Sequence, residues 1–525
     1  MSCRNAVYAL VACTALPVFA EFTIDRSVMS DEYWKLWNDV VQKRIDVGIE
    51  QHRKANAEVE VPAKDGTKVR VEQISHDFLF GAQFFFFNQL GRKDWNDKYK
   101  AVFGSLFNGA TVAFFWRTLE PYPMAVRFEE HYEDTEGFWN DCKNPKEQPH
   151  WRRPPPDPVI SYLKARGCRI HGHPLVWSLR DYHMPSWLWD DMCPEEEKFA
   201  LQQASGVRIP RGWDSKVPMG TREVRRHRDW CLAWRTVYKR LSEEKIASLV
   251  PTYIKAIGEY HERRIRMIAE RYGNLVDSWD AVNESASDFQ SFGCKAVRRR
   301  PFDKAGCGPM PADYAYQAFA WCMKYLPAKA KLNLNDYNMK PFLLQVKELE
   351  ANGARIDMIG TQMHIWGDDA SAAIAAGKGS ANFTPEGLDR RFNMLAKANR
   401  PILMSETTIS ASERTPQGEM VQAVIARNLY RYWFSVENLA GITWWNLVDD
   451  CGPAGEPTNS GIFTREMRPK AVYFMLDDLI NREWKTDMAV EAKNGKVTFR
   501  GFRGRYRLSW KDKSGRNTSK LVVVK

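Results

Sequence analysis

The sequence lacks long apolar runs beyond its first residues. After that segment, no stretch approaches the roughly 20 consecutive apolar residues that a membrane-spanning helix requires, so we predict no membrane span. Dense blocks of a single charge are scarce too. The formal net charge is +11, but the 76 basic residues are spread along the chain with a few local clusters. Dispersed charge is typical of solvated faces and argues against a nucleic-acid partner.

The N-terminus has the form of a secretory signal peptide. Arg4 supplies the positive charge, residues 6–18 are mostly apolar, and Ala20 is a small residue suited to cleavage. We therefore predict a signal peptide over residues 1–20 and a protein that is secreted, periplasmic or held at the cell surface. Lipidation at Cys13 is an open alternative.

Cysteine is sparse, with ten residues in a chain of 525. Removing the leader takes Cys3 and Cys13 and leaves eight. An even number permits disulfides in an oxidising compartment but does not define their pairing. Cys294 and Cys307 lie in one predicted loop and form the favoured local pair. Buried free thiols are the alternative.

Short, nearly continuous apolar runs recur along the chain and alternate with amphipathic segments. Such runs are typical of buried parallel strands. Between them, apolar residues such as Ile257, Ile265 and Ile268 recur at helical spacing. The predicted strands cover residues 78–85, 109–115, 169–177, 278–284, 331–336, 357–364, 401–408 and 441–447. Eight strands alternating with helices predict the α/β class and a (β/α)8 TIM barrel.

The remaining segments surround this barrel, which we assign to residues 78–481. Residues 21–77 should hold a helix and a β-hairpin that turns at Asp65-Gly66. Residues 482–525 contain three short strand-like runs and should form a small β appendage. Long insertions follow strands rather than helices, so they should emerge on the rim where such barrels keep their chemistry. They cover residues 121–157, 178–250, 285–311 and 448–465.

Polar and aromatic residues stand at the ends of most predicted strands. Because the carboxyl ends of barrel strands share one rim, these side chains should gather there. They include His173, Trp177, Asn283, Glu284, Asn335, Gln362, His364, Glu406, Trp445 and Asp449. Amides and imidazoles pair with hydroxyl groups, and indoles stack on sugar faces. Two carboxylates can cleave a glycosidic bond, so the pattern predicts a β-glycan hydrolase that needs no cofactor.

Glu284 and Glu406 would need different protonation states for this chemistry. One carboxyl must donate a proton to the leaving oxygen, while the other must be ionised to attack the anomeric carbon. Burial and mutual repulsion can separate the two titrations. A carboxyl separation of roughly 5 Å would predict retention of configuration, and a wider separation would predict inversion.

Seven segments, in order, resemble glycoside hydrolase family 10, the xylanase family of retaining (β/α)8-barrel enzymes. They are residues 171–177 (HGHPLVW), 184–188 (MPSWL), 279–284 (WDAVNE), 335–338 (NDYN), 359–364 (IGTQMH), 402–406 (ILMSE) and 441–445 (GITWW), the last followed by Asp449. The resemblance implies an endo-β-1,4-xylanase-like enzyme, expected here as a monomer, acting on a xylan-like polysaccharide.

The same resemblance implies roles for individual residues. Glu284 would be the general acid/base, and Glu406 would be the nucleophile, held through the network around His364. Asn283 would contact the 2-hydroxyl of the sugar being cleaved. The substrate-binding residues implied in all are His173, Trp177, Asn283, Gln362, His364 and Trp445.

Three departures from the family pattern stand out. Residues 112–117 (VAFFWR) are apolar and aromatic where the family has a Glu-Asn pair and a Lys that contact substrate on the non-reducing side. Thr407 and Thr408 follow Glu406 in place of Leu-Asp. A Trp expected shortly after Asp449 is replaced by residues 450–453 (DCGP). Both glutamates are kept, so we predict catalysis, with a decorated xylan or another β-linked glycan as the alternative to linear xylan.

Other readings are weaker. His171 and His173 alternate on one strand, as metal ligands of some barrel hydrolases do, but no recognised ligand-spacing motif accompanies them. A carbohydrate-binding protein that has lost turnover is a further alternative, because a fold does not guarantee activity. Arginines around Arg225 and Arg226 could recognise uronic-acid side groups or simply form a solvated face.

Overall fold

The computed structural model describes residues 22–179, 182–211, 221–292, 300–453 and 455–525, with the side chains of 221–226 and 290–292 left aside. The predicted signal peptide, Cys13 and Cys294 lie outside these residues, as do the side chains of Arg225 and Arg226. Cys307, the proposed partner of Cys294, is a free thiol.

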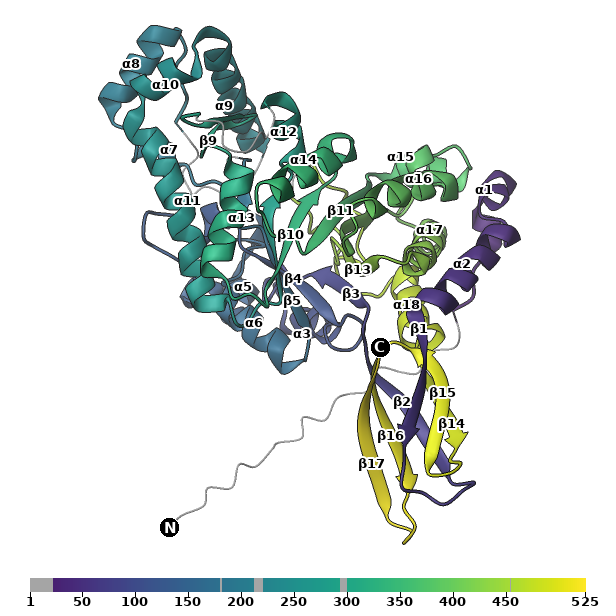
Figure 1. Ribbon diagram of the computed structural model, residues 1–525. Helices are drawn as coiled ribbons and strands as arrows, with labels where there is room; N and C mark the ends of the chain where they lie inside the picture. The colour runs from purple at the N-terminus through teal and green to yellow at the C-terminus, as the bar shows by residue number, and fades with distance from the viewer. Residues whose placement is uncertain (1–21, 180–181, 212–220, 293–299, 454) are drawn as a thin grey trace, which may run out of the picture.

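Parallel strands form a closed barrel at the centre of the molecule (Figure 1). Its strands are β3 (Leu79–Gln83), β4 (Gly109–Ala113), β5 (Arg169–His173), β7 (Ser278–Asn283), β10 (Lys331–Asp336), β11 (Met358–Ile365), β12 (Ile402–Ile409) and β13 (Leu439–Trp444). Pairing of β13 with β3, and of β7 with β10, closes the ring. The short β6 (Val176–Trp177) continues the path of β5 along β7. The TIM barrel is confirmed, and each of the eight predicted strands corresponds to one strand of the barrel.

Small residues let the barrel strands approach one another. A Cβ atom on Gly172 in β5 would lie 2.2 Å from the ring of Trp279 in β7. The indole is fully buried, so it has no space into which to retreat. Glycine is therefore required at this contact between neighbouring strands.

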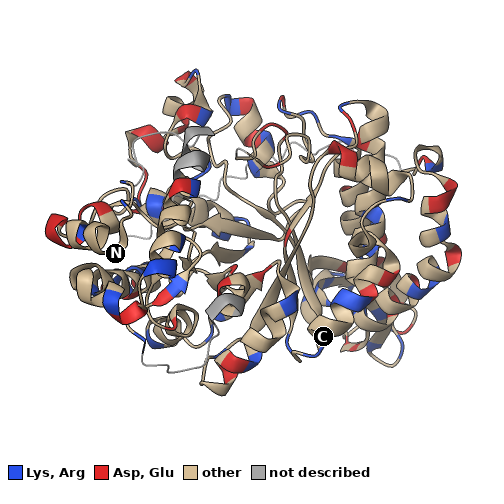
Figure 2. Cartoon of the chain, turned by 90° about the horizontal axis from the view of Figure 1, so that it is seen from above, with Lys and Arg blue, Asp and Glu red and all other residues tan. Residues whose placement is uncertain are grey.

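Helices cover the outside of the barrel and build up its rim. They are α3 (Lys93–Ala101), α4 (Trp116–Leu119), α5 (Glu136–Asp141), α6 (Pro156–Ala165), α7 (Trp187–Asp190), α8 (Glu195–Ser205), α9 (Thr221–Arg240), α10 (Glu243–Leu249), α11 (Pro251–Tyr272), α12 (Ala286–Phe292), α13 (Tyr314–Tyr325), α14 (Met339–Ala351), α15 (Asp368–Ala375), α16 (Pro385–Ala396), α17 (Pro416–Ser435) and α18 (Ala471–Asp478). On α11, the predicted stripe of Ile257, Ile265 and Ile268 is buried. Seen from above, basic and acidic residues are mixed over these helices (Figure 2).

The insertions after β5 and β7 fold on the rim. The first contributes α7 to α10, and the second contributes α12 and the two-stranded sheet of β8 (Asp303–Ala305) and β9 (Gly308–Met310). Figure 1 shows them together at the upper left, far from the β strands at the bottom of the view. None of the described helices combines the length and apolar character needed to cross a membrane.

The N-terminal strands and the C-terminal appendage form one β module. Both predicted N-terminal strands are present, as β1 (Lys54–Glu60) and β2 (Lys68–His76). Their hydrogen-bonding partners are C-terminal strands. β1 pairs with β15 (Lys496–Phe502), while β2 lies between β14 (Asp487–Glu491) and β16 (Gly504–Lys511), with β17 (Asn517–Val524) beyond β16.

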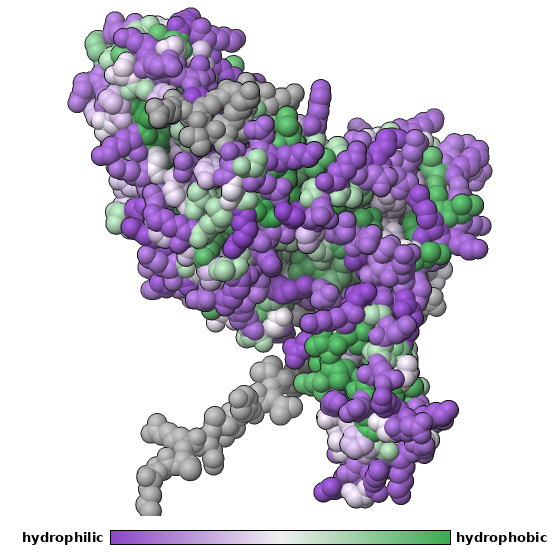
Figure 3. Space-filling view, in the orientation of Figure 1, coloured by the Kyte–Doolittle hydropathy of each residue, from purple (hydrophilic) through white to green (hydrophobic). Residues whose placement is uncertain are grey.

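Burial explains why β1 and β2 pair with C-terminal strands. Two strands alone cannot shield an apolar face from water. In the module, Val59 and Val71 share a core with Phe499, Leu508 and Trp510. Because β2 continues into β3, the module lies at the N-terminal ends of the barrel strands. Figure 3 shows apolar side chains gathered where the module meets the barrel and mostly polar side chains elsewhere on that face.

The preceding helical segment, predicted as one helix, is divided into α1 (Asp31–Leu36) and α2 (Asp39–Arg53). Asn38 causes the division, because its side chain accepts a hydrogen bond from the backbone N–H of Val41 and begins the second helix.

Candidate active site

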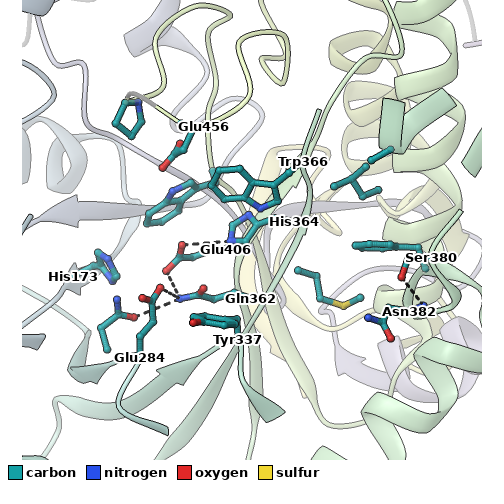
Figure 4. Close-up of a pocket in the computed structure, with 18 of the residues that line it drawn as sticks. His173, Glu284, Tyr337, Gln362, His364, Trp366, Ser380, Asn382, Glu406 and Glu456 are labelled. Carbon is teal, nitrogen blue, oxygen red and sulfur yellow. Dashed lines mark hydrogen bonds and ion pairs between the residues drawn. The ribbon is translucent and has the colours of Figure 1, made fainter. Parts of the chain in front are cut away.

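One pocket of about 880 Å³ collects the side chains predicted for the site. It lies at the carboxyl ends of the barrel strands, and Figure 4 shows the carboxylates at one side of it. Its lining includes Glu284, Glu406, His173, Trp177, Asn283, Gln362, His364 and Trp445. Residues separated by more than 270 positions in the chain therefore face a single cavity.

Gln362 joins the two carboxylates. Its Nε2 donates to Glu284 Oε1 at 3.1 Å and to Glu406 Oε1 at 2.9 Å (Figure 4). Because both oxygens bond to the same nitrogen, they lie within about 6 Å of each other. Glu284 follows β7 directly and has a φ angle of 53°, which is rare for a residue with a side chain and common at functional sites.

Asn335 is a second donor to Glu406. Its Nδ2 lies 3.0 Å from Glu406 Oε1 and 2.8 Å from Asn283 Oδ1. The sequence placed Asn335 at a strand end but did not predict this role, although the NDYN segment was a signal. Glu406 thus accepts two amide hydrogen bonds on one oxygen, and these bonds favour its ionised form.

Burial raises the pKa of both glutamates. For Glu284 the pKa rises to about 7, with the negative charge of Asp336 adding to the effect of burial. Burial and then the charge of Glu284 raise the pKa of Glu406 well above its ordinary value. The carboxyls interact strongly, so they titrate as a pair and resist carrying two negative charges.

His364 lies on the other side of Glu406. Its Nε2 is 3.7 Å from Glu406 Oε2, and its Nδ1 is 2.9 Å from the hydroxyl of Thr408. Burial and the nearby charge of Arg391 lower the pKa of His364 to about 3, so the imidazole is neutral near pH 7. Arg391 reaches the site from α16 and donates to the carbonyl of Gln362.

His171 and His173 both contact the buried carboxylate of Asp280. The distances are 3.0 Å from His171 Nε2 and 2.6 Å from His173 Nδ1. Burial by itself would raise the pKa of Asp280, but the two imidazoles hold it below its usual range. These contacts account for the alternating histidines through a structural pairing that orients His173 toward the pocket.

An aromatic wall occupies one end of the pocket. Phe85, Phe115 and Trp445 form a buried cluster with Ala113, and Trp177 packs against it. The guanidinium of Arg153 lies 3.7 Å from the centre of the Phe115 ring. This wall stands where the sequence departs from the family pattern at residues 112–117. Phe85 and Arg153 were not predicted as site residues.

Exposed aromatic residues also line the pocket. Trp366 is 47% exposed and Tyr337 is 54% exposed, and residues of the segment between α15 and α16 extend the lining. Figure 4 shows Ser380 and Asn382 of that segment away from the carboxylates. Asp449, by contrast, lies outside the pocket lining and bonds Lys470 Nζ and the backbone N–H of Gly461. Its contacts are structural.

The fold and the site define a class of protein, namely a (β/α)8 barrel with paired carboxylates at the carboxyl ends of its strands. Residues 237–479 match the model of glycosyl hydrolase family 10. Among curated proteins, endo-1,4-beta-xylanase A of Halalkalibacterium halodurans is 27% identical over 245 residues, which are 42% of this chain and 57% of that protein. Endo-1,4-beta-xylanase A of Xylanibacter ruminicola is 31% identical over 141 residues, or 26% of this chain and 35% of that protein.

This match over residues 237–479 and the similarity to these xylanases confirm the resemblance to glycosyl hydrolase family 10 that the sequence showed. The chain spans about half or less of the length of these curated relatives. Among solved structures, it is similar to a family 10 protein from Paenibacillus barcinonensis (20% identity, TM-score 0.47, 77% of this chain and 95% of that one). Xylanase 10B of Thermotoga maritima is similar at 18% identity and a TM-score of 0.48, covering 78% of this chain and 96% of that one.

Proposed function

We propose that this protein is a secreted retaining glycoside hydrolase that cleaves β-1,4-xylosidic bonds in xylan, with decorated xylan as its preferred form. The observation that carries the proposal is the shared contact of Gln362 with Glu284 and Glu406. Two oxygens within about 6 Å match the roughly 5–5.5 Å spacing of retaining enzymes better than the roughly 6.5–9.5 Å of inverting ones.

The proposed reaction begins with a proton on Glu284 and a negative charge on Glu406. This distribution is favoured because Glu406 accepts hydrogen bonds from two amides. Glu406 attacks the anomeric carbon while Glu284 donates its proton to the departing oxygen, leaving a covalent glycosyl-enzyme. Glu284, now ionised, takes a proton from water while the water oxygen attacks the anomeric carbon and displaces Glu406. The bond to Glu406 breaks, and the sugar leaves with its original configuration.

The walls of the pocket support the choice of a decorated substrate. Phe85, Phe115 and Arg153 replace the polar contacts that the family resemblance implies on the non-reducing side. Among the described residues, Arg153 forms no ion pair. Burial lowers its pKa, and the charge of Glu456, which lines the same pocket, partly offsets this effect. A uronic-acid side group would supply a direct ionic partner, and such a pair is strong in a partly desolvated site.

The test is the release of new reducing ends by the purified protein. The panel holds glucuronoxylan, arabinoxylan, mixed-linkage glucan and mannan, with Glu406→Gln as the blank. We expect cleavage of xylans, greatest on glucuronoxylan, and loss of cleavage in the variant. Cleavage of glucan or mannan alone would replace xylan with another β-linked glycan.

Binding without turnover is the second candidate, because the altered wall departs from the family pattern. Affinity electrophoresis in xylan separates it from catalysis. A hydrolase requires that Glu284→Gln and Glu406→Gln bind xylan but do not cut it. If the unaltered protein also binds and releases no reducing ends, the protein is a carbohydrate-binding module.

A further inference from the structure

A second cluster of reactive side chains lies outside the catalytic pocket. His227 and Cys231 project from α9, and Cys307 stands in the turn between β8 and β9. One ligand atom from each lies within 4.8 Å of the other two. Nε2 of His227 is 3.6 Å from Cys231 Sγ and 3.6 Å from Cys307 Sγ. None of the three lines the catalytic pocket.

These distances match a tetrahedral zinc site. Zinc lies roughly 2.0–2.1 Å from a histidine nitrogen and about 2.3 Å from a thiolate sulfur, so tetrahedral geometry places nitrogen and sulfur about 3.6 Å apart. His227 and Cys231 are four residues apart on one helix and therefore share a face. One imidazole and two thiolates form a ligand set that zinc favours over magnesium or calcium.

The surrounding structure holds the three residues in place. Trp230, beside Cys231 on α9, donates from Nε1 to the carbonyl of Cys307 at 2.6 Å. Gly308 has a φ angle of 121°, and a Cβ there would lie 3.2 to 3.3 Å from Trp234 and Trp230. The turn thus approaches α9 closely, where a larger residue would crowd the two indoles and strain the backbone, and this brings Cys307 to the two helical ligands.

We infer that His227, Cys231 and Cys307 bind a zinc ion that links the two rim insertions. The described residues supply three ligands, which leaves one tetrahedral position for a further ligand. The ion has a structural role, because it joins α9 to a turn more than 70 residues later in the chain. It also acts on the rim of the catalytic pocket, since the ring of His227 packs edge-on against Tyr182 at 5.5 Å and Tyr182 lines that pocket.

The competing chemistry is a disulfide. Two thiols this close can lose two hydrogens to an oxidant and form a Cys231–Cys307 bond, which would remove both thiolate ligands. The experiment must therefore measure the metal and the state of the thiols together, on the same full-length protein.

The purified chain is incubated with Zn²⁺ and desalted, and its metal content is measured by mass spectrometry. We expect one zinc per chain, lost in Cys231→Ser and Cys307→Ser and retained in Cys168→Ser, which alters a buried free thiol elsewhere. Co²⁺ in place of Zn²⁺ should give visible bands and a sulfur-to-cobalt charge-transfer band. Chelation should lower the Tm, because the ion links the two insertions. The catalytic glutamates are not zinc ligands and should keep their positions.

Alkylation followed by peptide mass spectrometry provides a readout that needs no variant. Bound Zn²⁺ should protect Cys231 and Cys307, but leave Cys142 reactive. The inference is overturned if the two peptides are joined by a disulfide, if both thiols react equally with and without Zn²⁺, or if zinc content is unchanged in Cys231→Ser. These outcomes are independent of xylan cleavage, so the inference does not depend on the proposed activity.

Discussion

The hydroxyl of Thr408 lies 2.9 Å from Nδ1 of His364, on the side of the imidazole that faces away from Glu406. By resemblance to the family, this position would hold an aspartate, whose charge would favour a protonated imidazole. A threonine hydroxyl orients the ring without adding charge. Glu406 therefore faces a neutral imidazole and depends on Asn335 and Gln362 for its stabilising donors.

Thr408→Val tests the importance of this orientation. The substitution keeps the side-chain shape but leaves Nδ1 of the buried His364 without its partner, at a cost of about 1–3 kcal/mol in the free energy of unfolding. We expect a lower Tm and a kcat for xylan reduced by about tenfold, an order-of-magnitude figure for a misplaced catalytic neighbour. Thr408→Ser, which keeps the hydroxyl, is the matched control and should retain most activity. Equal kcat values for both variants would show that the hydrogen bond is unimportant.

The raised pKa of Glu284 predicts the alkaline limit of activity. The residue must be protonated to act as an acid, and its folded pKa of about 7 lies above its ordinary value. Activity should therefore be present below about pH 7 and fall as the pH rises through that value. The charged form is penalised by burial, so stability should decline as the pH rises from about 4.5, the ordinary pKa of a glutamate, to about 7, and should level off above that value.

Asp336→Asn tests the cause of that pKa. Removing the negative charge of Asp336 should lower the pKa of Glu284 and move the alkaline limb of kcat/KM to lower pH. Aryl xylosides with good leaving groups provide the control. Their cleavage needs little proton donation, so the fall of kcat/KM at alkaline pH should be smaller for them than for xylan. An unchanged alkaline limb on xylan would show that the charge of Asp336 does not raise the pKa of Glu284.

Arg153 should determine the preference for acidic side groups. Arg153→Gln removes the cation next to Phe115, and we expect KM for glucuronoxylan to rise about tenfold, close to the roughly 1.5–3 kcal/mol of a charged hydrogen bond. KM for arabinoxylan, which is neutral, should change little. Arg153→Lys keeps the charge but not the planar fork and should show an intermediate effect. A parallel loss on both xylans would assign Arg153 a purely structural role.

The sequence predicted the barrel closely because buried parallel strands are apolar along their whole length and end where polar residues begin. Residues 278–284, for example, became β7 with Glu284 immediately after it. The partner of β1 could not be predicted, since alternating residues show which face is buried but not which strand lies alongside. The position of Arg153 and the meeting of His227 with Cys307 depend on how long insertions fold, and no local pattern encodes that.

The β module offers a separate test, because it lies at the end of the barrel opposite the catalytic rim. Leu508 in β16 is fully buried in the module core. Leu508→Ala should lower the free energy of unfolding by about 2–5 kcal/mol, through lost burial and the cavity left behind. Activity per folded molecule should stay the same, because none of the described residues that line the pocket belongs to the module core. Leu521→Ala, on the edge strand β17 where the residue is 58% exposed, is the matched control and should change stability little.

Calorimetry combined with active-site titration separates the effect on stability from the effect on activity. If Leu508→Ala unfolds the module at a lower temperature than the barrel, the two are independent folding units; a single shifted transition with unchanged kcat means that the β module stabilises the barrel from a distance. A loss of kcat in fully folded protein would contradict the separation of module and site.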